Sequence, residues 1–270
     1  MATSRFERAG GSDRILICVS LNPIPQISEL RRPFHHLASV AKATAEHVSA
    51  YMLNLEPFEP DLGGAQTLRD LLKNLPANNI TIAEGGYIEQ GVVGRQYTDL
   101  IFDDLDFHAI VTTPFLGFDF IAPFVERRDR LVFLRCSLPE PGTKQRHPRQ
   151  SMERESLIGH VAELTNQWNH HDNLGLVIGA TDLAGLTAAR KLCPNLPILV
   201  TSADGADVDL GRVVVAGLGE DEPCLVVQSE RDIVYASMGD DFTASARAAA
   251  RGWRRRLDDL TTAASAARQQ

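Results

Sequence analysis

Lysine is scarce in this sequence. The 270 residues include 27 lysines and arginines together, and only four of these are lysines, at positions 42, 73, 144 and 191. Three of the four fall in segments with helical periodicity, and Lys144 lies in a polar stretch between apolar runs. Chemistry that requires a lysine ammonium group therefore has few residues on which to draw.

Long apolar runs are also missing. No segment approaches the ~20 consecutive apolar residues of a membrane span, and residues 1–14 lack the apolar region of a signal peptide. The formal net charge is −8, which makes nucleic acid an unfavourable general partner. We therefore expect a cytoplasmic protein that binds neither membranes nor nucleic acid.

Cysteine is sparse as well, with four residues and no C-x-x-C pair. Three of the four lie in apolar, strand-like runs, which predicts buried free thiols in a reducing compartment. The pairs His35-His36 and His170-His171 fall on predicted helices, where adjacent residues do not share a face and so do not share a metal. We expect neither a metal site nor a cofactor.

The stretch Gly175–Val200 shows the local pattern that the rest of the chain repeats. An apolar run, Gly175–Ala180, turns through Thr181 and Asp182 into an amphipathic segment, Leu183–Leu192, and a second apolar run follows. A short apolar run bounded by turn residues is typical of a strand buried on both faces. The stretch therefore predicts a strand, a helix and a parallel strand, with Asp182 as the helix N-cap.

Eight short apolar runs recur along the chain, mostly with helix-length segments between them. Alternating strands and helices predict an α/β protein with a parallel sheet, and eight such units predict a closed (β/α)8 TIM barrel of about 250 residues. An open doubly wound sheet is the alternative, although no G-x-G-x-x-G follows the first run. We expect one barrel domain over residues 14–260, closed by a helix over Phe242–Leu260, between a flexible N-terminus (1–13) and a flexible tail (261–270). The predicted strands are Ile15–Leu21, Ala50–Leu55, Asn79–Glu84, Ala109–Pro114, Leu131–Cys136, Gly175–Ala180, Ile198–Ser202 and Cys224–Ser229.

Several runs match a known family in order and at the right spacing. The clearest are Thr113–Asp119, Gly175–Thr181 and Ser229–Ser237. With these runs, the chain from about Ile15 to about Arg251 resembles the orotidine 5′-phosphate decarboxylase family in its longer bacterial form. The resemblance implies a TIM barrel with its site at the C-terminal ends of the strands. It also implies a homodimer in which the second acid of the site serves the neighbouring subunit.

The resemblance further implies where the reacting groups would lie. The family uses an alternating network of lysine, aspartate, lysine and aspartate, in which one lysine protonates the carbon that loses carbon dioxide. The four positions here are Met52, Glu84, Gly86 and Glu89, so both acids persist as glutamates and both cations are lost. We predict Glu84 and Glu89 as the catalytic candidates and expect uncompensated negative charge beside them. Lys144, in the loop after the fifth strand, is the one lysine placed to substitute, and its polar surroundings favour a solvated loop residue.

The predicted substrate-binding residues resemble the family's to different degrees. Asn22 stands where the family has an acid that holds the ribose, and Met52 fills the place of a lysine. Ser137 keeps the serine that contacts the pyrimidine, and Thr181 ends a matching run. These four residues are our candidates for contacts to the sugar and the base.

Only part of the family's phosphate-binding pattern is present in this sequence. Arg231 keeps the family's phosphate-binding arginine and suits a bidentate contact. The Gly-rich phosphate loop, however, is replaced by residues 201–209, where Asp204 and Asp207 would repel a phosphate dianion. Anion binding by Arg231 therefore competes with a salt bridge to Asp204, Asp207 or Glu230.

Three functions remain open from the sequence. The first is a family member that does not decarboxylate, either a pseudoenzyme or a protein that binds nucleotides or other anions. The second is a diverged enzyme that uses Glu84 and Glu89 on a nucleoside-like or phosphorylated small molecule, and the third is a working orotidine 5′-phosphate decarboxylase of pyrimidine biosynthesis. For all three we expect a small-molecule partner and a homodimer that buries the face around Glu89 and Phe115-Leu116.

Overall fold

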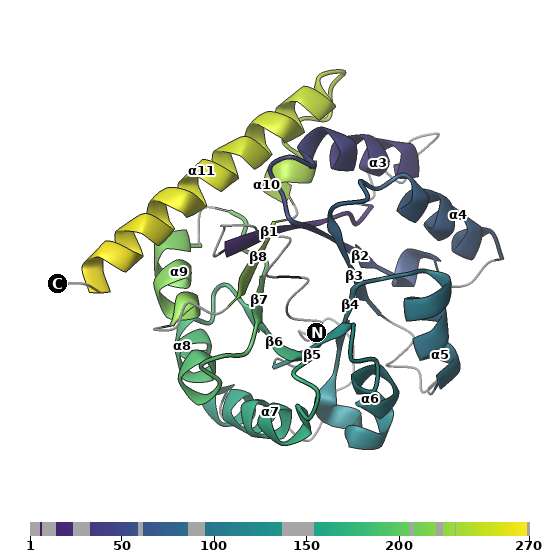
Figure 1. The fold of residues 1–270 in the computed structure, drawn as a ribbon. Coiled ribbons are helices and arrows are strands. Elements are labelled where there is room, and N and C mark those ends of the chain that lie inside the picture. Colours follow the sequence, from purple (N-terminus) through teal and green to yellow (C-terminus); the bar gives the residue numbers. More distant parts are fainter. Residues whose placement is uncertain are drawn as a thin grey trace.

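Eight parallel strands close into a barrel in the computed structural model, which describes residues 6, 15–23, 33–58, 62–85, 95–136, 154–205, 208–219, 224–229 and 231–268. The strands pair in sequence order, and β8 pairs with β1. Figure 1 shows them around a common axis with the helices outside. The predicted TIM barrel is confirmed, and each strand boundary lies within two residues of its expected position. The strands are β1 (Ile15–Ser20), β2 (Ala50–Asn54), β3 (Ile80–Glu84), β4 (Ala109–Thr112), β5 (Leu131–Arg135), β6 (Leu174–Gly179), β7 (Ile198–Thr201) and β8 (Leu225–Ser229).

Helices follow the strands and cover the outside of the barrel (Figure 1). They are α3 (Pro33–Thr44), η1 (Glu56–Phe58), α4 (Leu62–Lys73), α5 (Arg95–Asp99), η3 (Leu100–Asp104), η4 (Pro114–Leu116), α6 (Phe118–Val125), α7 (Arg154–Trp168), α8 (Leu183–Leu192), α9 (Leu210–Leu218), α10 (Arg231–Val234) and α11 (Phe242–Arg268). The helix α8 has its predicted bounds, and the Asp182 carboxylate caps it by accepting a hydrogen bond from the Gly185 N–H at 2.9 Å. The helices α6, α9 and α10 follow β4, β7 and β8.

The last helix is longer than predicted. Residues 261–268, expected to belong to a flexible tail, continue α11 as regular helix. Ala264 is buried, and the Thr261 hydroxyl donates a hydrogen bond to the Leu257 carbonyl at 2.7 Å. The helix packs against α3 and α9, and Figure 1 shows it crossing the outside of the barrel between them. It therefore covers the seam where the last strand meets the first.

Alternate residues of the strands fill the barrel interior. Successive residues of a strand point to opposite faces, so every second side chain enters the barrel. These side chains form one apolar cluster, which includes Met52, Ile82 and Phe133. Phe6, from the segment expected to be flexible, is 1% exposed and joins the cluster, with its ring edge-on to that of Phe133 at 5.8 Å. The other strand residues pack against the helices in a second cluster.

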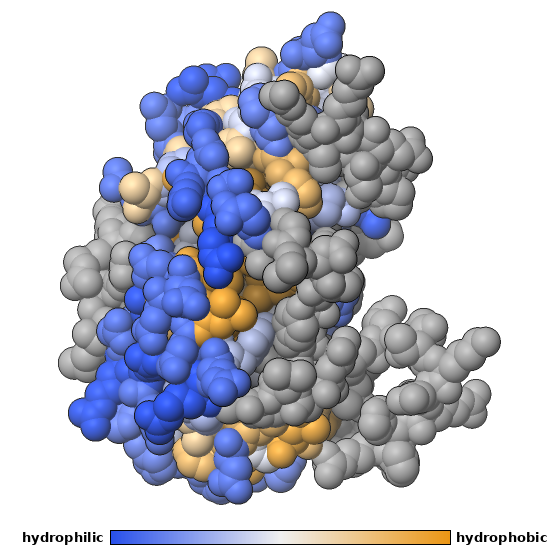
Figure 2. All heavy atoms as spheres, turned by 90° about the vertical axis from the view of Figure 1, so that its right-hand side faces the viewer, coloured by the Kyte–Doolittle hydropathy of each residue, from blue (hydrophilic) through white to orange (hydrophobic). Residues whose placement is uncertain are grey.

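Few large hydrophobic side chains are exposed among the described residues. Figure 2 shows hydrophilic residues over much of the face that carries α4 and α5, with hydrophobic side chains gathered near its middle. Among the described residues, the exposed large hydrophobic side chains are Leu116, Leu192, Val215 and Met238. No helix in the described ranges is long and apolar enough to cross a membrane.

Gly175 and Gly179 on β6 provide a matched test of the interior packing. A Cβ atom at Gly175 would lie 2.7 Å from Phe133 Cδ1 and 2.7 Å from the Pro197 carbonyl oxygen, whereas nothing lies within 4 Å of one at Gly179. We predict that Gly175→Ala lowers the free energy of unfolding by about 1–3 kcal/mol through overpacking. Gly179→Ala should change it by less than about 0.5 kcal/mol. Urea denaturation followed by circular dichroism measures both values, and equal stability of the two variants would contradict this packing.

Candidate functional site

The C-terminal ends of the strands bring charged side chains to one end of the barrel. Ile82 and Phe133 point into the apolar interior, so the residues two positions later on the same strands face the barrel mouth. On β3 this residue is Glu84, and on β5 it is Arg135. Functional sites of TIM barrels lie at this end of the strands, so the two side chains mark the candidate site.

Glu84 and Arg135 form an ion pair at the mouth. Arg135 Nη2 donates a hydrogen bond to Glu84 Oε1, and the side chains of Arg135 and Glu84 are 28% and 23% exposed. A charge-assisted contact in a partly buried position is stronger than a neutral hydrogen bond. The expectation of uncompensated negative charge at Glu84 is therefore wrong, because an arginine from β5 balances it.

The residues beneath this pair are apolar or neutral. Met52 is 1% exposed and packs in the interior cluster, so it brings no charge to the mouth. Burial, and to a smaller extent the Glu84 carboxylate, raises the pKa of the Cys18 thiol far above its ordinary value. Cys18 therefore remains a neutral thiol at physiological pH and is not a nucleophile.

Asn22 joins the ends of β1 and β2. Its Oδ1 accepts a hydrogen bond from the Asn54 N–H at 2.9 Å, and the Tyr235 hydroxyl donates to the Asn22 carbonyl oxygen. Asn54 Oδ1 in turn accepts from the Glu56 N–H at 2.9 Å. Asn22 thus links three segments of backbone at the rim of the barrel.

Asp204 holds the chain where an anion site was predicted, after β7 and β8. Its carboxylate accepts hydrogen bonds from the Ser229 hydroxyl at 2.7 Å, from the Arg231 N–H at 3.1 Å and from the Asp232 N–H at 3.4 Å. Gly205, with φ +92°, lets the chain turn directly after this aspartate. The backbone donors at the start of α10 are therefore bound to a carboxylate of the protein itself, and the Arg231 side chain is exposed.

Comparison with known proteins identifies the relatives of this barrel. The chain is 31% identical over 265 residues to the orotidine 5′-phosphate decarboxylase of Roseiflexus sp. (strain RS-1), an alignment that covers 95% of each chain. It is 34% identical over 250 residues to that of Verminephrobacter eiseniae (strain EF01-2), covering 87% of this chain and 90% of the other. The chain belongs to the orotidine 5′-phosphate decarboxylase family. No family model matches it.

Solved structures of orotidine monophosphate decarboxylases share the fold. The structure of Leishmania donovani OMP decarboxylase superposes with a TM-score of 0.76 at 24% identity, covering 97% of this chain and 98% of that one. Orotidine 5′-monophosphate decarboxylase from Plasmodium berghei gives a TM-score of 0.72 at 12% identity, covering 98% and 100%. At these low sequence identities, the superpositions show that this chain and the solved decarboxylases share the same barrel architecture.

The structure places four of the seven residues predicted from the orotidine 5′-phosphate decarboxylase pattern at the C-terminal ends of their strands. They are Asn22 after β1, Glu84 on β3, Thr181 after β6 and Arg231 after β8. Met52 lies in the middle of β2 and is buried in the barrel interior. Thr181 is exposed in the turn that leads to the capping residue of α8. The other two, Glu89 and Ser137, lie outside the described residues, as does Lys144.

Arg135 is the site residue that the sequence reasoning missed. The family pattern directs attention to lysines, and Arg135 corresponds to none of them. A signal was nevertheless present, because Arg135 lies near the end of the apolar run Leu131–Cys136 with the same parity as the inward-facing Phe133. A charged residue at that position predicts a side chain at the barrel mouth.

We predict a measurable coupling between Glu84 and Arg135. In a double-mutant cycle with Glu84→Gln and Arg135→Gln, the free energies of unfolding should be non-additive by about 0.5–2 kcal/mol, since each single variant leaves the other charge unpaired. Urea denaturation at pH 7 measures the three variants. The matched control is the exposed pair Arg247–Glu46, whose side chains are 55% and 72% exposed and whose coupling should be smaller. Additive effects at Glu84 and Arg135 would contradict the pair.

Proposed function

We propose that this protein binds a small nucleoside-like or phosphorylated ligand at the barrel mouth and does not decarboxylate orotidine 5′-phosphate at the rate of its relatives. One observation carries the proposal: Glu84 takes its positive partner from Arg135 of β5. In the family pattern the cations of the site are lysines, and the matching positions in this sequence are Met52 and Gly86. In the described part of the mouth, the cation beside Glu84 is therefore an arginine and not a lysine.

The type of cation decides whether a proton is available. Loss of carbon dioxide from orotidine 5′-phosphate leaves negative charge on C6 of the pyrimidine, and that carbon must then take up a proton. A lysine can donate one because its pKa shifts readily in a buried site. An arginine stays protonated in proteins, so Arg135 can stabilise negative charge but cannot supply the proton. Met52 has no ionisable group, which leaves the described part of the mouth without the acid that the reaction needs.

The phosphate end supports the same conclusion. Asp204 already accepts hydrogen bonds from the Ser229 hydroxyl and the Arg231 N–H. A ligand phosphate brought against the same donors would meet a like charge, and two unit charges ~4 Å apart repel by roughly 4 kcal/mol at an effective dielectric constant of about 20. A phosphorylated ligand therefore has to displace Asp204 or to contact only the exposed side chain of Arg231. Either arrangement differs from a phosphate held by a Gly-rich loop.

Purified protein should show little or no decarboxylation of orotidine 5′-phosphate, measured as loss of its ultraviolet absorbance. Removing one preorganised charged donor costs typical sites about 10²–10³ in rate, and the losses of two lysines are not simply additive. We therefore expect turnover far below one per second. Thermal-shift measurements with uridine, orotidine and their monophosphates serve as the binding control, because a ligand at 100 times its dissociation constant stabilises the fold by about 2.7 kcal/mol.

Two results would overturn the proposal. One is turnover of about one per second or faster that Glu84→Ala abolishes, since the described site would then be catalytic. The other is loss of such turnover in Lys144→Ala, which would identify the loop lysine as the proton donor. Absence of any thermal shift with all of these nucleosides and nucleotides would contradict the binding part of the proposal and leave the decarboxylation result unaffected.

We also propose that the protein is a homodimer. The proposal rests on the family resemblance and on Leu116, which is 52% exposed beside the partly buried Phe115. An exposed apolar side chain next to the barrel mouth is suited to the core of an interface. Light scattering at micromolar concentration should give twice the chain mass of 29.6 kDa, and Leu116→Asp should shift the mass towards that of one chain. A single-chain mass for the unmodified protein would contradict the dimer.

A further inference from the structure

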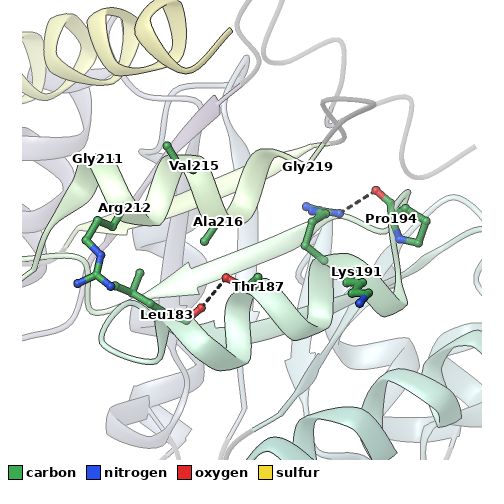
Figure 3. Close-up of a pocket in the computed structure, with 10 residues that line it drawn as sticks. Leu183, Thr187, Lys191, Pro194, Gly211, Arg212, Val215, Ala216 and Gly219 are labelled. Carbon is green, nitrogen blue, oxygen red and sulfur yellow. Dashed lines mark hydrogen bonds between the residues drawn. The ribbon is translucent and has the colours of Figure 1, made fainter. Parts of the chain in front are cut away.

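A groove lies in the helical layer between α8 and α9, on the outside of the barrel (Figure 3). Its cavity volume is about 690 Å³, within the roughly 300–1,000 Å³ of small-molecule pockets. Residues of both helices line it, together with Pro194 after α8 and Gly219 after α9. The groove is separate from the mouth of the barrel, where the family places its site.

All the charged residues that line the groove are positive. Arg190, Lys191 and Arg212 line it, and none of its ten lining residues is acidic, although the chain has a net charge of −8. Lys191 and Arg212 are exposed, and Figure 3 shows Arg212 beside Leu183 at one end with Lys191 further along α8. The acids at positions 220–222 follow in the sequence and lie outside the described residues. Positive side chains in a concave surface attract anions by focusing the local field.

Arg190 places a buried positive charge at the wall of the groove. It is 5% exposed, and its guanidinium donates to the carbonyl oxygens of Gly217 at 2.7 Å, Leu196 at 2.6 Å and Pro194 at 3.1 Å. Its Nη2 atom has no hydrogen-bond partner among the described residues. Burial lowers the pKa of Arg190 to about 10, against a smaller opposing effect of the Cys224 and Cys193 thiols. Neutral carbonyl groups therefore compensate this cation only in part, and an anion nearby would be favoured.

The rest of the groove is apolar. Leu183 of α8 and Val215 and Ala216 of α9 line it, and Val215 is 60% exposed to solvent. Apolar surface of this kind, next to fixed positive charge, matches a ligand with an apolar body and one negative group. A purely inorganic anion would leave Val215 uncovered, and a neutral apolar molecule would leave the cations without a partner.

We infer that the groove between α8 and α9 binds a small amphipathic anion, with an apolar body against Leu183, Val215 and Ala216 and a carboxylate, sulfonate or phosphate group near Lys191 or Arg212. The site is independent of the proposed function, because it shares no residue with the barrel mouth.

Fluorescence titration with 8-anilinonaphthalene-1-sulfonate, an amphipathic anion, tests the inference on the full chain. We expect the double variant Lys191→Gln/Arg212→Gln to bind the probe about tenfold more weakly than the unmodified protein, because two attractive charges are removed. The matched control, Arg251→Gln/Arg255→Gln, removes two exposed charges from α11 and should stay within about twofold. Circular dichroism and melting temperature establish that both double variants remain folded.

Displacement of the bound probe distinguishes the contribution of the ligand's charge to binding from that of its apolar body. Octanoate should displace it from the unmodified protein, and octanol, which has the same chain length without the charge, should displace it far less. Equal weakening of probe binding in the two double variants would overturn the inference, since it would show a general charge effect. Equal displacement by octanol and octanoate would overturn it as well, because the cations of the groove would then have no role.

A Val215→Asp variant should also weaken the binding, and unchanged affinity would place the probe elsewhere.

Discussion

The ion pair between Glu84 and Arg135 is the interaction on which the barrel mouth depends. A carboxylate with 23% exposure above an apolar interior needs a partner, and the alternation of side chains on β5 delivers one from the position two residues after Phe133. Met52 is buried in the interior, and the positive charge beside Glu84 comes from β5. In the described part of the mouth, the carboxylate of Glu84 is therefore balanced by a cation that cannot give up its proton.

After β7 and β8, Asp204 likewise receives the hydrogen bonds of Ser229 and of the start of α10. Glu84 and Asp204 are thus both partnered by the protein's own groups, so an anion at either position would have to displace one of these contacts. The groove between α8 and α9 has the opposite character, since its cations face solvent or neutral carbonyl groups. The two regions would therefore select different ligands.

Much of the architecture followed from the sequence, because apolar runs of strand length separated by helix-length segments report directly on a barrel. The N-cap at Asp182 also depends only on neighbouring residues in the sequence, and it was predicted correctly. Arg135 was missed because the search for a cation was confined to lysines, and the hydrogen bonds of Asp204 depend on β7 and β8 meeting in space. The helical residues 261–268 and the burial of Phe6 were missed for a related reason, since both follow from packing against distant segments rather than from local propensity.

The most direct test asks whether any residue at the mouth can exchange a proton with C6 of the pyrimidine. An acid that protonates this carbon after decarboxylation also removes its proton in the reverse direction, so uridine 5′-monophosphate in D2O would gain deuterium at C6. Nuclear magnetic resonance of the C6 proton follows the exchange with and without protein. If Arg135 has taken the place of the lysines, the exchange rate should equal that of buffer alone. Deuterium incorporation that requires the protein and disappears in Glu84→Ala would contradict that conclusion.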